Sequence, residues 1–169
     1  MSIVALVPAR SGSKRAAGKN VRLVRGVPLL AYTIAAARAS GVFDGIYVST
    51  DSHEYAQIAR DYGAETIIRP AQISGDISPD FLFVEHALEA LAYRAIPKPL
   101  AFSILRPTSP LRQPETVQRA WAQFQGSGYD SLRAIERGKQ HPNKMWLLGK
   151  DGGMGPYVPF SVERLTGQP

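Results

Sequence analysis

The sequence predicts an α/β fold built on a doubly wound, mostly parallel sheet. Near the N-terminus, residues 3–7 form a short apolar run, which is typical of a strand buried on both faces of a parallel sheet. Such runs then alternate with longer segments rich in helix formers, the order that βαβ units produce. The composition, 44% hydrophobic and 20% charged, is that of an ordinary folded domain and not of a disordered chain.

The first part of the chain predicts three strands and two helices. They are, in order, a strand over residues 3–7, a helix over 28–39, a strand over 45–50, a helix ending at 62 and a strand over 65–68. Proline opens the first helix and Gly41 follows it, as the preferences of helix ends require. Asp51 and Ser52 both offer an N-cap for the second helix, and Gly63 closes it.

The alternation continues to about residue 136. The predicted elements are a helix from 79 to about 94, a strand over 100–105, a helix over 115–125 and a fifth strand over 131–135. Residues 138–169 break the pattern, because they hold six glycines and four prolines with little periodicity. We therefore expect residues 1–137 to form the α/β domain and residues 138–169 to form an extension.

Bulk properties exclude several classes of protein. No apolar run approaches the roughly 20 residues that a membrane-spanning helix needs. The absence of cysteine excludes disulfides and thiolate metal sites and favours a cytoplasmic protein. The net charge is +6, but six of the 20 basic residues lie between Arg10 and Arg25 with no acid among them. This clustering favours a local anion site over a nucleic-acid interface.

The strongest functional signal is a basic loop directly after the first predicted strand. It reads Pro8-Ala9-Arg10-Ser11-Gly12-Ser13-Lys14 and continues to Gly18-Lys19-Asn20. In open α/β sheets ligands bind at the carboxyl ends of strands, where small residues let backbone N–H groups approach phosphate oxygens. A merely solvated loop is disfavoured, because clustered cations repel one another without an anion.

Two other nucleotide-binding patterns fit this loop poorly. The stretch from Gly12 to Asn20 approaches the P-loop pattern, but its spacing is one residue too long. Asn20 also stands where a Ser or Thr hydroxyl should bind magnesium. The glycine fingerprint of dinucleotide-binding domains is absent from the sequence.

The loop closely resembles the nucleotide-binding signature of the acylneuraminate cytidylyltransferases, also called CMP-sialic acid synthetases, and of relatives acting on other 2-keto-3-deoxy sugar acids. Three further segments resemble the same family in the same order: Val48-Ser49-Thr50-Asp51-Ser52, Arg69-Pro70 with Ser74-Gly75-Asp76, and Leu105-Arg106-Pro107-Thr108-Ser109-Pro110-Leu111-Arg112. The resemblance covers about residues 3–145. It implies a Rossmann-like fold of the nucleotide-diphospho-sugar transferase type.

The resemblance also implies a reaction and a set of site residues. CMP is transferred from CTP to the anomeric hydroxyl of an acidic sugar, and pyrophosphate is released. Arg10 and Lys14 would cradle the triphosphate as the catalytic cations. The residues expected to complete the nucleotide and substrate pocket are Ala9, Ser11, Gly12, Ser13, Lys19, Asn20, Arg69, Asp76, Arg106, Gln140 and Lys144.

For several of these residues a structural role competes with the functional one. Asp51 is expected chiefly as a helix N-cap, and Asp76 either organises the pocket loop or only makes a turn. Arg106 departs from the family, which often has a glutamine there. Gln140 and Lys144 flank a His-Pro pair that lies near the acidic sugar in the resembled family, but such a pair is equally common in surface turns.

The resemblance implies Mg²⁺ as cofactor and a homodimer as the assembly. In typical members the metal is held by two aspartates of a segment beyond the position of Pro169, so no metal ligand is predicted within this sequence. We therefore expect CTP binding with weak turnover, the alternative being a truncated, inactive relative that only binds nucleotide or dimerises. Residues 138–169 carry an apolar set suited to a dimerisation arm.

Overall fold

The computed structural model describes residues 2–13, 16–136, 138 and 145–158. They fall into two compact units, Met1–Asp130 and Ser131–Pro169. The predicted division after residue 137 stays a prediction.

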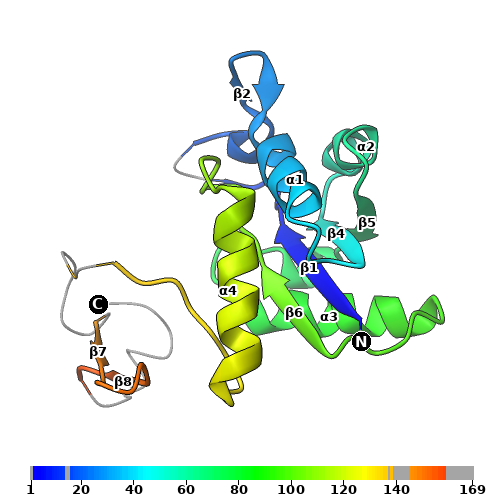
Figure 1. Ribbon diagram of the computed structural model, residues 1–169. Helices are drawn as coiled ribbons and strands as arrows, with labels where there is room; N and C mark the ends of the chain where they lie inside the picture. The colour runs from blue at the N-terminus through cyan, green and yellow to red at the C-terminus, as the bar shows by residue number, and fades with distance from the viewer. Residues whose placement is uncertain (1, 14–15, 137, 139–144, 159–169) are drawn as a thin grey trace. The chain divides into compact units, whose positions relative to one another are not determined.

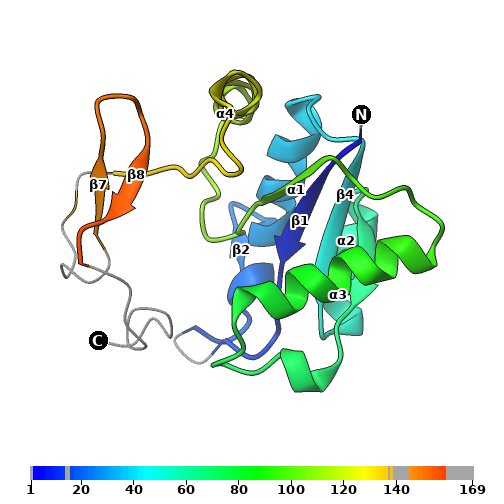
Figure 2. The same cartoon turned by 90° about the horizontal axis from the view of Figure 1, so that it is seen from below.

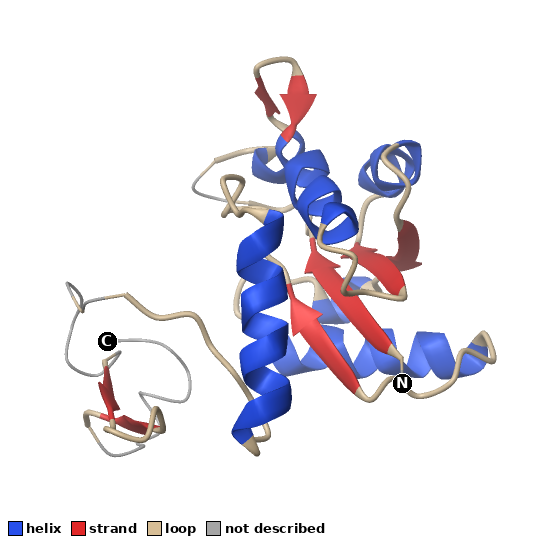
Figure 3. Cartoon of the chain, in the orientation of Figure 1, coloured by secondary structure: helices blue, strands red, loops and turns tan. Residues whose placement is uncertain are grey.

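A four-stranded parallel sheet forms the centre of the first unit (Figures 1 and 3). Its strands are β1 (Ile3–Pro8), β4 (Gly45–Thr50), β5 (Glu65–Ile68) and β6 (Ala101–Ile104). They lie in the order β5-β4-β1-β6, and every neighbouring pair is parallel. The chain therefore winds outward from β1 in both directions, which confirms the predicted class. The carboxyl ends of β1 and β6 form the switch point at which such sheets bind ligands.

Helices cover both faces of this sheet. They are α1 (Leu29–Ala39), α2 (His53–Asp61), α3 (Asp80–Tyr93) and α4 (Pro114–Ser127). Figure 2 shows α3 on one side of the sheet and α1 on the other. None of the helices in the described part of the chain is long and apolar enough to cross a bilayer.

The alternation of side chains along β1 builds two cores. Ala5 and Val7 pack with residues of α1 and α2, whereas Val4 and Leu6 pack with residues of α3. Successive strand residues point to opposite faces, so a run that is apolar throughout serves both layers. This is why the short apolar run at the N-terminus predicts the central strand correctly.

The helix ends follow the sequence signals, with one correction. Ser52 is the N-cap of α2, since its hydroxyl accepts a hydrogen bond from the Tyr55 N–H at 3.3 Å. The expectation that Asp51 serves chiefly as this cap is wrong, because its carboxylate accepts hydrogen bonds from Ser11 in the loop after β1. After α1, Gly41 adopts a left-handed conformation with φ of 64°, as a glycine past a helix end does.

Four short elements were not predicted: η1 (Lys19–Val21), β2 (Leu23–Val24), β3 (Val27–Pro28) and η2 (Ala71–Ile73). The antiparallel hairpin β2–β3 turns through Arg25 and Gly26, whose φ angles are 50° and 81°. Two successive positive φ angles suit the right-handed twist of a two-residue hairpin. The dipeptide differs from the Asn-Gly and Asp-Gly pairs that usually signal this turn, which explains the omission.

The fifth strand predicted over residues 131–135 is wrong. Residues 131–136 are exposed and have no strand structure, and no described strand pairs with them. An alternating pattern supplies side chains for a strand but not the partner that satisfies its backbone. The second unit contains instead an antiparallel pair, β7 (Trp146–Leu148) with β8 (Met154–Pro156).

Candidate functional site

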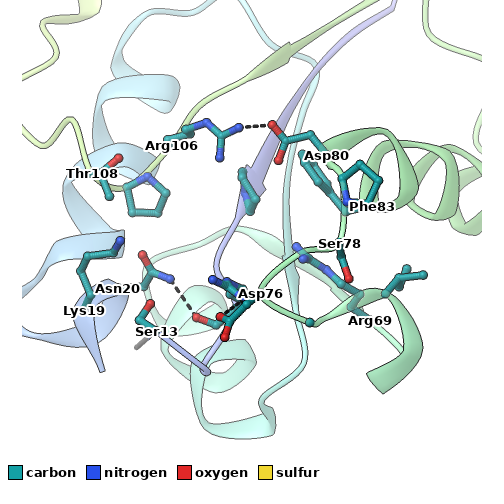
Figure 4. A pocket seen from close by; sticks show the side chains of 16 residues that line it. Ser13, Lys19, Asn20, Arg69, Asp76, Ser78, Asp80, Phe83, Arg106 and Thr108 are labelled. Carbon is teal, nitrogen blue, oxygen red and sulfur yellow. Dashed lines mark hydrogen bonds and ion pairs between the residues drawn. The ribbon is translucent and has the colours of Figure 1, made fainter. Parts of the chain in front are cut away.

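A pocket of about 260 Å³ lies at the carboxyl end of β1 (Figure 4). Its walls come from the loop after β1, the end of β5, the segment that leads into α3, and the loop after β6. These segments are distant in sequence and meet because parallel strands end at the same edge of a sheet. The predicted site residues that line the pocket are Arg10, Ser13, Lys19, Asn20, Arg69, Asp76 and Arg106.

The loop after β1 is held by hydrogen bonds of its own. Ala9 is buried and extends the strand pairing, since its N–H donates to the Ser49 carbonyl at 2.9 Å. Asn20 is also buried and donates from Nδ2 to the Arg10 carbonyl at 3.0 Å. Ser13 N–H donates to the Ser11 carbonyl at 2.9 Å. Asn20 thus supports the loop in addition to lining the pocket.

Ser11 is bound to an aspartate that the sequence did not assign to the site. Its N–H donates to Asp51 Oδ1 at 2.7 Å, and its hydroxyl donates to Oδ2 at 3.0 Å. Asp51 directly follows β4, the neighbour of β1, so the two strand ends are joined through these bonds. The order of strands could have revealed this contact, but the order is not readable from one sequence.

Arg10 forms an ion pair with Asp76 across the pocket. The distance from Nη1 to Oδ1 is 2.7 Å, and the two side chains are 31% and 28% exposed. Asp76 comes from the segment before α3, so it joins a second wall to the loop. The pair places a carboxylate against the cation that the sequence assigns to the triphosphate.

Arg69 is the buried cation of the pocket. It donates from Nε to the Ser49 hydroxyl at 3.1 Å and from Nη2 to the Ser49 carbonyl at 3.0 Å. Its guanidinium carbon lies 5.1 Å from the centre of the Phe83 ring, a cation–π contact. Burial lowers the pKa of Arg69 from its ordinary value, and the charge of Asp51 opposes that change. A guanidinium nevertheless stays protonated, so the pocket retains a fixed positive charge.

Arg106 and Asp80 form a second ion pair at the pocket, from Nη2 to Oδ2. Both side chains are about half exposed, and Asp80 is the first residue of α3. Figure 4 shows the pair beside Phe83, with Lys19 on the side of the loop. The arginine that departs from the resembled family therefore has an acidic partner in the same pocket.

The remaining predicted site residues fall in two groups. Ser11 faces Asp51, and Gly12 is exposed with open space around the position of a Cβ atom. Lys14, Gln140 and Lys144 lie outside the described residues. Their assignment to nucleotide or sugar stays a prediction.

A family model described as cytidylyltransferase matches residues 4–143. The chain belongs to the cytidylyltransferase family. It is 40% identical over 124 residues to an N-acylneuraminate cytidylyltransferase of Escherichia coli O18:K1:H7, covering 73% of this chain and 28% of that protein. It is 43% identical over 123 residues to a CMP-N,N'-diacetyllegionaminic acid synthase of Legionella pneumophila, covering 71% of this chain and 52% of that protein. This cytidylyltransferase chain thus spans about half or less of the length of these two relatives.

Solved structures support the same fold. A CMP:2-keto-3-deoxy-manno-octonic acid synthetase complexed with CTP matches with a TM-score of 0.60 and 18% identity, covering 76% of this chain and 49% of that one. A 4-diphosphocytidyl-2C-methyl-D-erythritol synthase matches with a TM-score of 0.56 and 13% identity, covering 82% of this chain and 65% of that one. These matches confirm the predicted Rossmann-like nucleotidyltransferase fold.

The described residues of this cytidylyltransferase do not fit a magnesium site. The aspartates at or beside the pocket each bind another side chain: Asp51 binds Ser11, Asp76 binds Arg10, and Asp80 binds Arg106. No group of three or more acidic or histidine side chains that could hold a metal occurs in the described part of the chain. A hard cation prefers several oxygen ligands, so the chemistry of these residues is that of anion binding.

Proposed function

We propose that this chain binds CTP and takes part in the transfer of CMP to a sialic-acid-like 2-keto-3-deoxy sugar acid, with release of pyrophosphate. The observation that carries the proposal is a pocket with four cations, in a member of the cytidylyltransferase family. The cations are Arg10, Lys19, Arg69 and Arg106. They lie where a doubly wound sheet binds its ligand.

The reaction makes a specific demand on such a pocket. The anomeric hydroxyl of the sugar gives up its proton to the solvent as its oxygen bonds to the α-phosphorus, the bond from that phosphorus to the bridging oxygen breaks, and pyrophosphate departs with the electron pair. Negative charge therefore grows on the phosphates, and fixed cations stabilise it without reorganisation. Arg69 suits this task because Ser49 and Phe83 already hold its guanidinium. Arg10 and Lys14 are proposed to contact the triphosphate directly.

The proposed acceptor is an acidic sugar, and the proposed cofactor is Mg²⁺. The names of the two relatives refer to acylneuraminate and to diacetyllegionaminic acid, which favours an acidic sugar as acceptor. Gln140 and Lys144 are proposed to meet its carboxylate. The requirement for Mg²⁺ stays a prediction, because the described residues offer no ligand set for the ion.

The proposed assembly is a homodimer. The hairpin β7–β8 supports this proposal, because Leu147, Leu148 and Tyr157 are exposed on or directly after it. Large apolar side chains exposed on so small a unit are typical of an interface. Sedimentation at micromolar concentration should give the mass of two chains, and a monomer would contradict the dimer.

Calorimetry with CTP, UTP, ATP and GTP tests the nucleotide site. CTP should bind most tightly, and Arg10→Ala should weaken it, whereas Arg94→Ala should not. Arg94 is a matched control, since it follows the last residue of α3 and pairs with Glu65, while the pocket lies at the first turn. Absence of CTP binding would overturn the proposal.

Pyrophosphate release tests the transfer step. The chain is incubated with CTP and a panel of sugar acids, with and without magnesium. Release that depends on one sugar acid would establish the reaction and the acceptor. CTP binding without release would favour the alternative, a nucleotide-binding family member with little turnover.

A further inference from the structure

One peptide group of the pocket loop is held at both of its polar ends. The Arg10 carbonyl accepts a hydrogen bond from Asn20 Nδ2 at 3.0 Å, and the Ser11 N–H donates to Asp51 Oδ1 at 2.7 Å. This carbonyl and this N–H belong to the same planar unit. Two bonds from opposite ends therefore fix its orientation, and turning the plane would break both.

Asp51 uses both carboxylate oxygens on one loop residue. The second oxygen accepts the Ser11 hydroxyl at 3.0 Å, so both the backbone and the side chain of Ser11 are held. Hydrogen bonds to an ionised carboxylate are about twice as strong as those between neutral groups. The contact spans 40 residues of sequence, which makes it a tertiary clamp and not a local turn.

The clamp is anchored to the sheet. Asp51 directly follows β4, whose Ser49 carbonyl accepts the Ala9 N–H and whose Thr50 carbonyl accepts the Arg69 N–H. Because Ser52 caps α2, the Asp51 carboxylate is available to the loop. A rigid strand end thus supports a segment that lacks regular structure.

We propose that Asp51 is a positioning residue of the nucleotide site. The peptide group that it holds sets ψ of Arg10 and φ of Ser11, the two dihedrals that lead the chain from β1 into the loop. Asp51 therefore determines where Arg10, on the strand side, lies relative to Ser13 and Lys19 on the loop side. The inference rests on the proposed function, because it concerns the geometry that a triphosphate meets.

The chain offers a matched control for this role. Asp44 precedes β4 and accepts the Ile3 N–H at 2.7 Å, at the opposite end of β1 and β4 from the pocket. It makes the same kind of bond between the same two strands. Both Asp51→Asn and Asp44→Asn should therefore lower stability, but only the first should affect nucleotide binding.

The test measures CTP affinity of the full chain by calorimetry, with thermal melting to verify folding. Asp51→Asn should weaken CTP about tenfold, the loss expected for a charge-assisted contact. Ser11→Ala, which removes only the hydroxyl bond, should weaken it about threefold. Asp44→Asn should stay within about twofold of the original chain. If Asp51→Asn fails to fold, Ser11→Ala decides, and unchanged affinity in it would overturn the proposal.

A double variant separates positioning from general loosening of the fold. If Asp51 acts through the placement of Arg10, Asp51→Asn combined with Arg10→Ala should weaken CTP by less than the product of the two single effects. Fully multiplicative effects would overturn the positioning role. If the original chain and the Asp51→Asn variant bind CTP equally well, this proposal alone is overturned. If the original chain binds no CTP, the proposed function is overturned as well.

Discussion

Replacing Asp76 by asparagine should strengthen CTP binding. The carboxylate of Asp76 lies 2.7 Å from Arg10 Nη1, so a triphosphate must compete with it for the guanidinium. Charge-assisted hydrogen bonds contribute about 1.5–3 kcal/mol and exposed ion pairs about 0.2–1 kcal/mol. With side chains 31% and 28% exposed, this pair falls between those cases, at about 1 kcal/mol. Removing that competition corresponds to about a fivefold gain in affinity.

Calorimetry of CTP binding at two salt concentrations measures the gain. The difference between Asp76→Asn and the original chain should shrink at high salt, because partly exposed charges are screened. Asp61→Asn serves as control, since Asp61 lies at the end of α2 and its carboxylate accepts a hydrogen bond from Gln57 Nε2, one turn earlier on the same helix. Weaker CTP binding by Asp76→Asn would refute competition and show that Asp76 holds Arg10 in place for the ligand.

Three further outcomes can be measured. Phe83→Ala should lower the free energy of unfolding, measured by urea titration, by about 3–5 kcal/mol, because it leaves a cavity next to Arg69. Phe83→Leu, the control, should lower it by less because it leaves a smaller cavity. Burial raises the pKa of Tyr47 and of Tyr55 in the folded protein. Their contribution to folding stability is therefore full below the pKa of an unfolded tyrosine, about 10, and is lost as the pH rises through the folded-state pKa values. The double variant Tyr47→Phe/Tyr55→Phe should therefore lose less stability at alkaline pH, measured by the midpoint of urea unfolding. A loss as steep as that of the original chain would contradict this reasoning. Lys14→Ala should weaken CTP by about 1–3 kcal/mol in calorimetry, and equal affinity would remove Lys14 from the site.

The parts of the fold that sequence predicted are those set by local signals. The apolar run of β1, the proline before α1 and the cap at Ser52 each act within a few residues. Local signals of this kind need no knowledge of the strand order. The strand predicted over residues 131–135 is wrong because a strand also needs a pairing partner, and the local side-chain pattern carries no information about that partner.

The candidate site shows the same limit. Arg10, Lys19 and Asn20 were predicted because they stand in one loop after one strand. Asp51 was assigned to a helix cap, since its contact with Ser11 depends on β4 lying beside β1. Once the strand order is known, the contact is expected, because neighbouring parallel strands bring their following residues together. Tertiary adjacency is therefore the missing information, and not residue chemistry.

The pocket balances its charges in a way that gives its aspartates opposite effects on the ligand. Its described lining holds four cations and two acids, a net charge of +2. Both acids, Asp76 and Asp80, neutralise arginines of the pocket, so a triphosphate that binds these arginines would exchange internal ion pairs for external ones. Affinity is then a difference between two sets of pairs, and weakening the internal set favours the ligand. Asp51 belongs to neither set of ion pairs, because its carboxylate accepts hydrogen bonds from the loop and acts on Arg69 only through its charge. Loss of charge at Asp76 should therefore tighten CTP binding, while the same loss at Asp51 should weaken it.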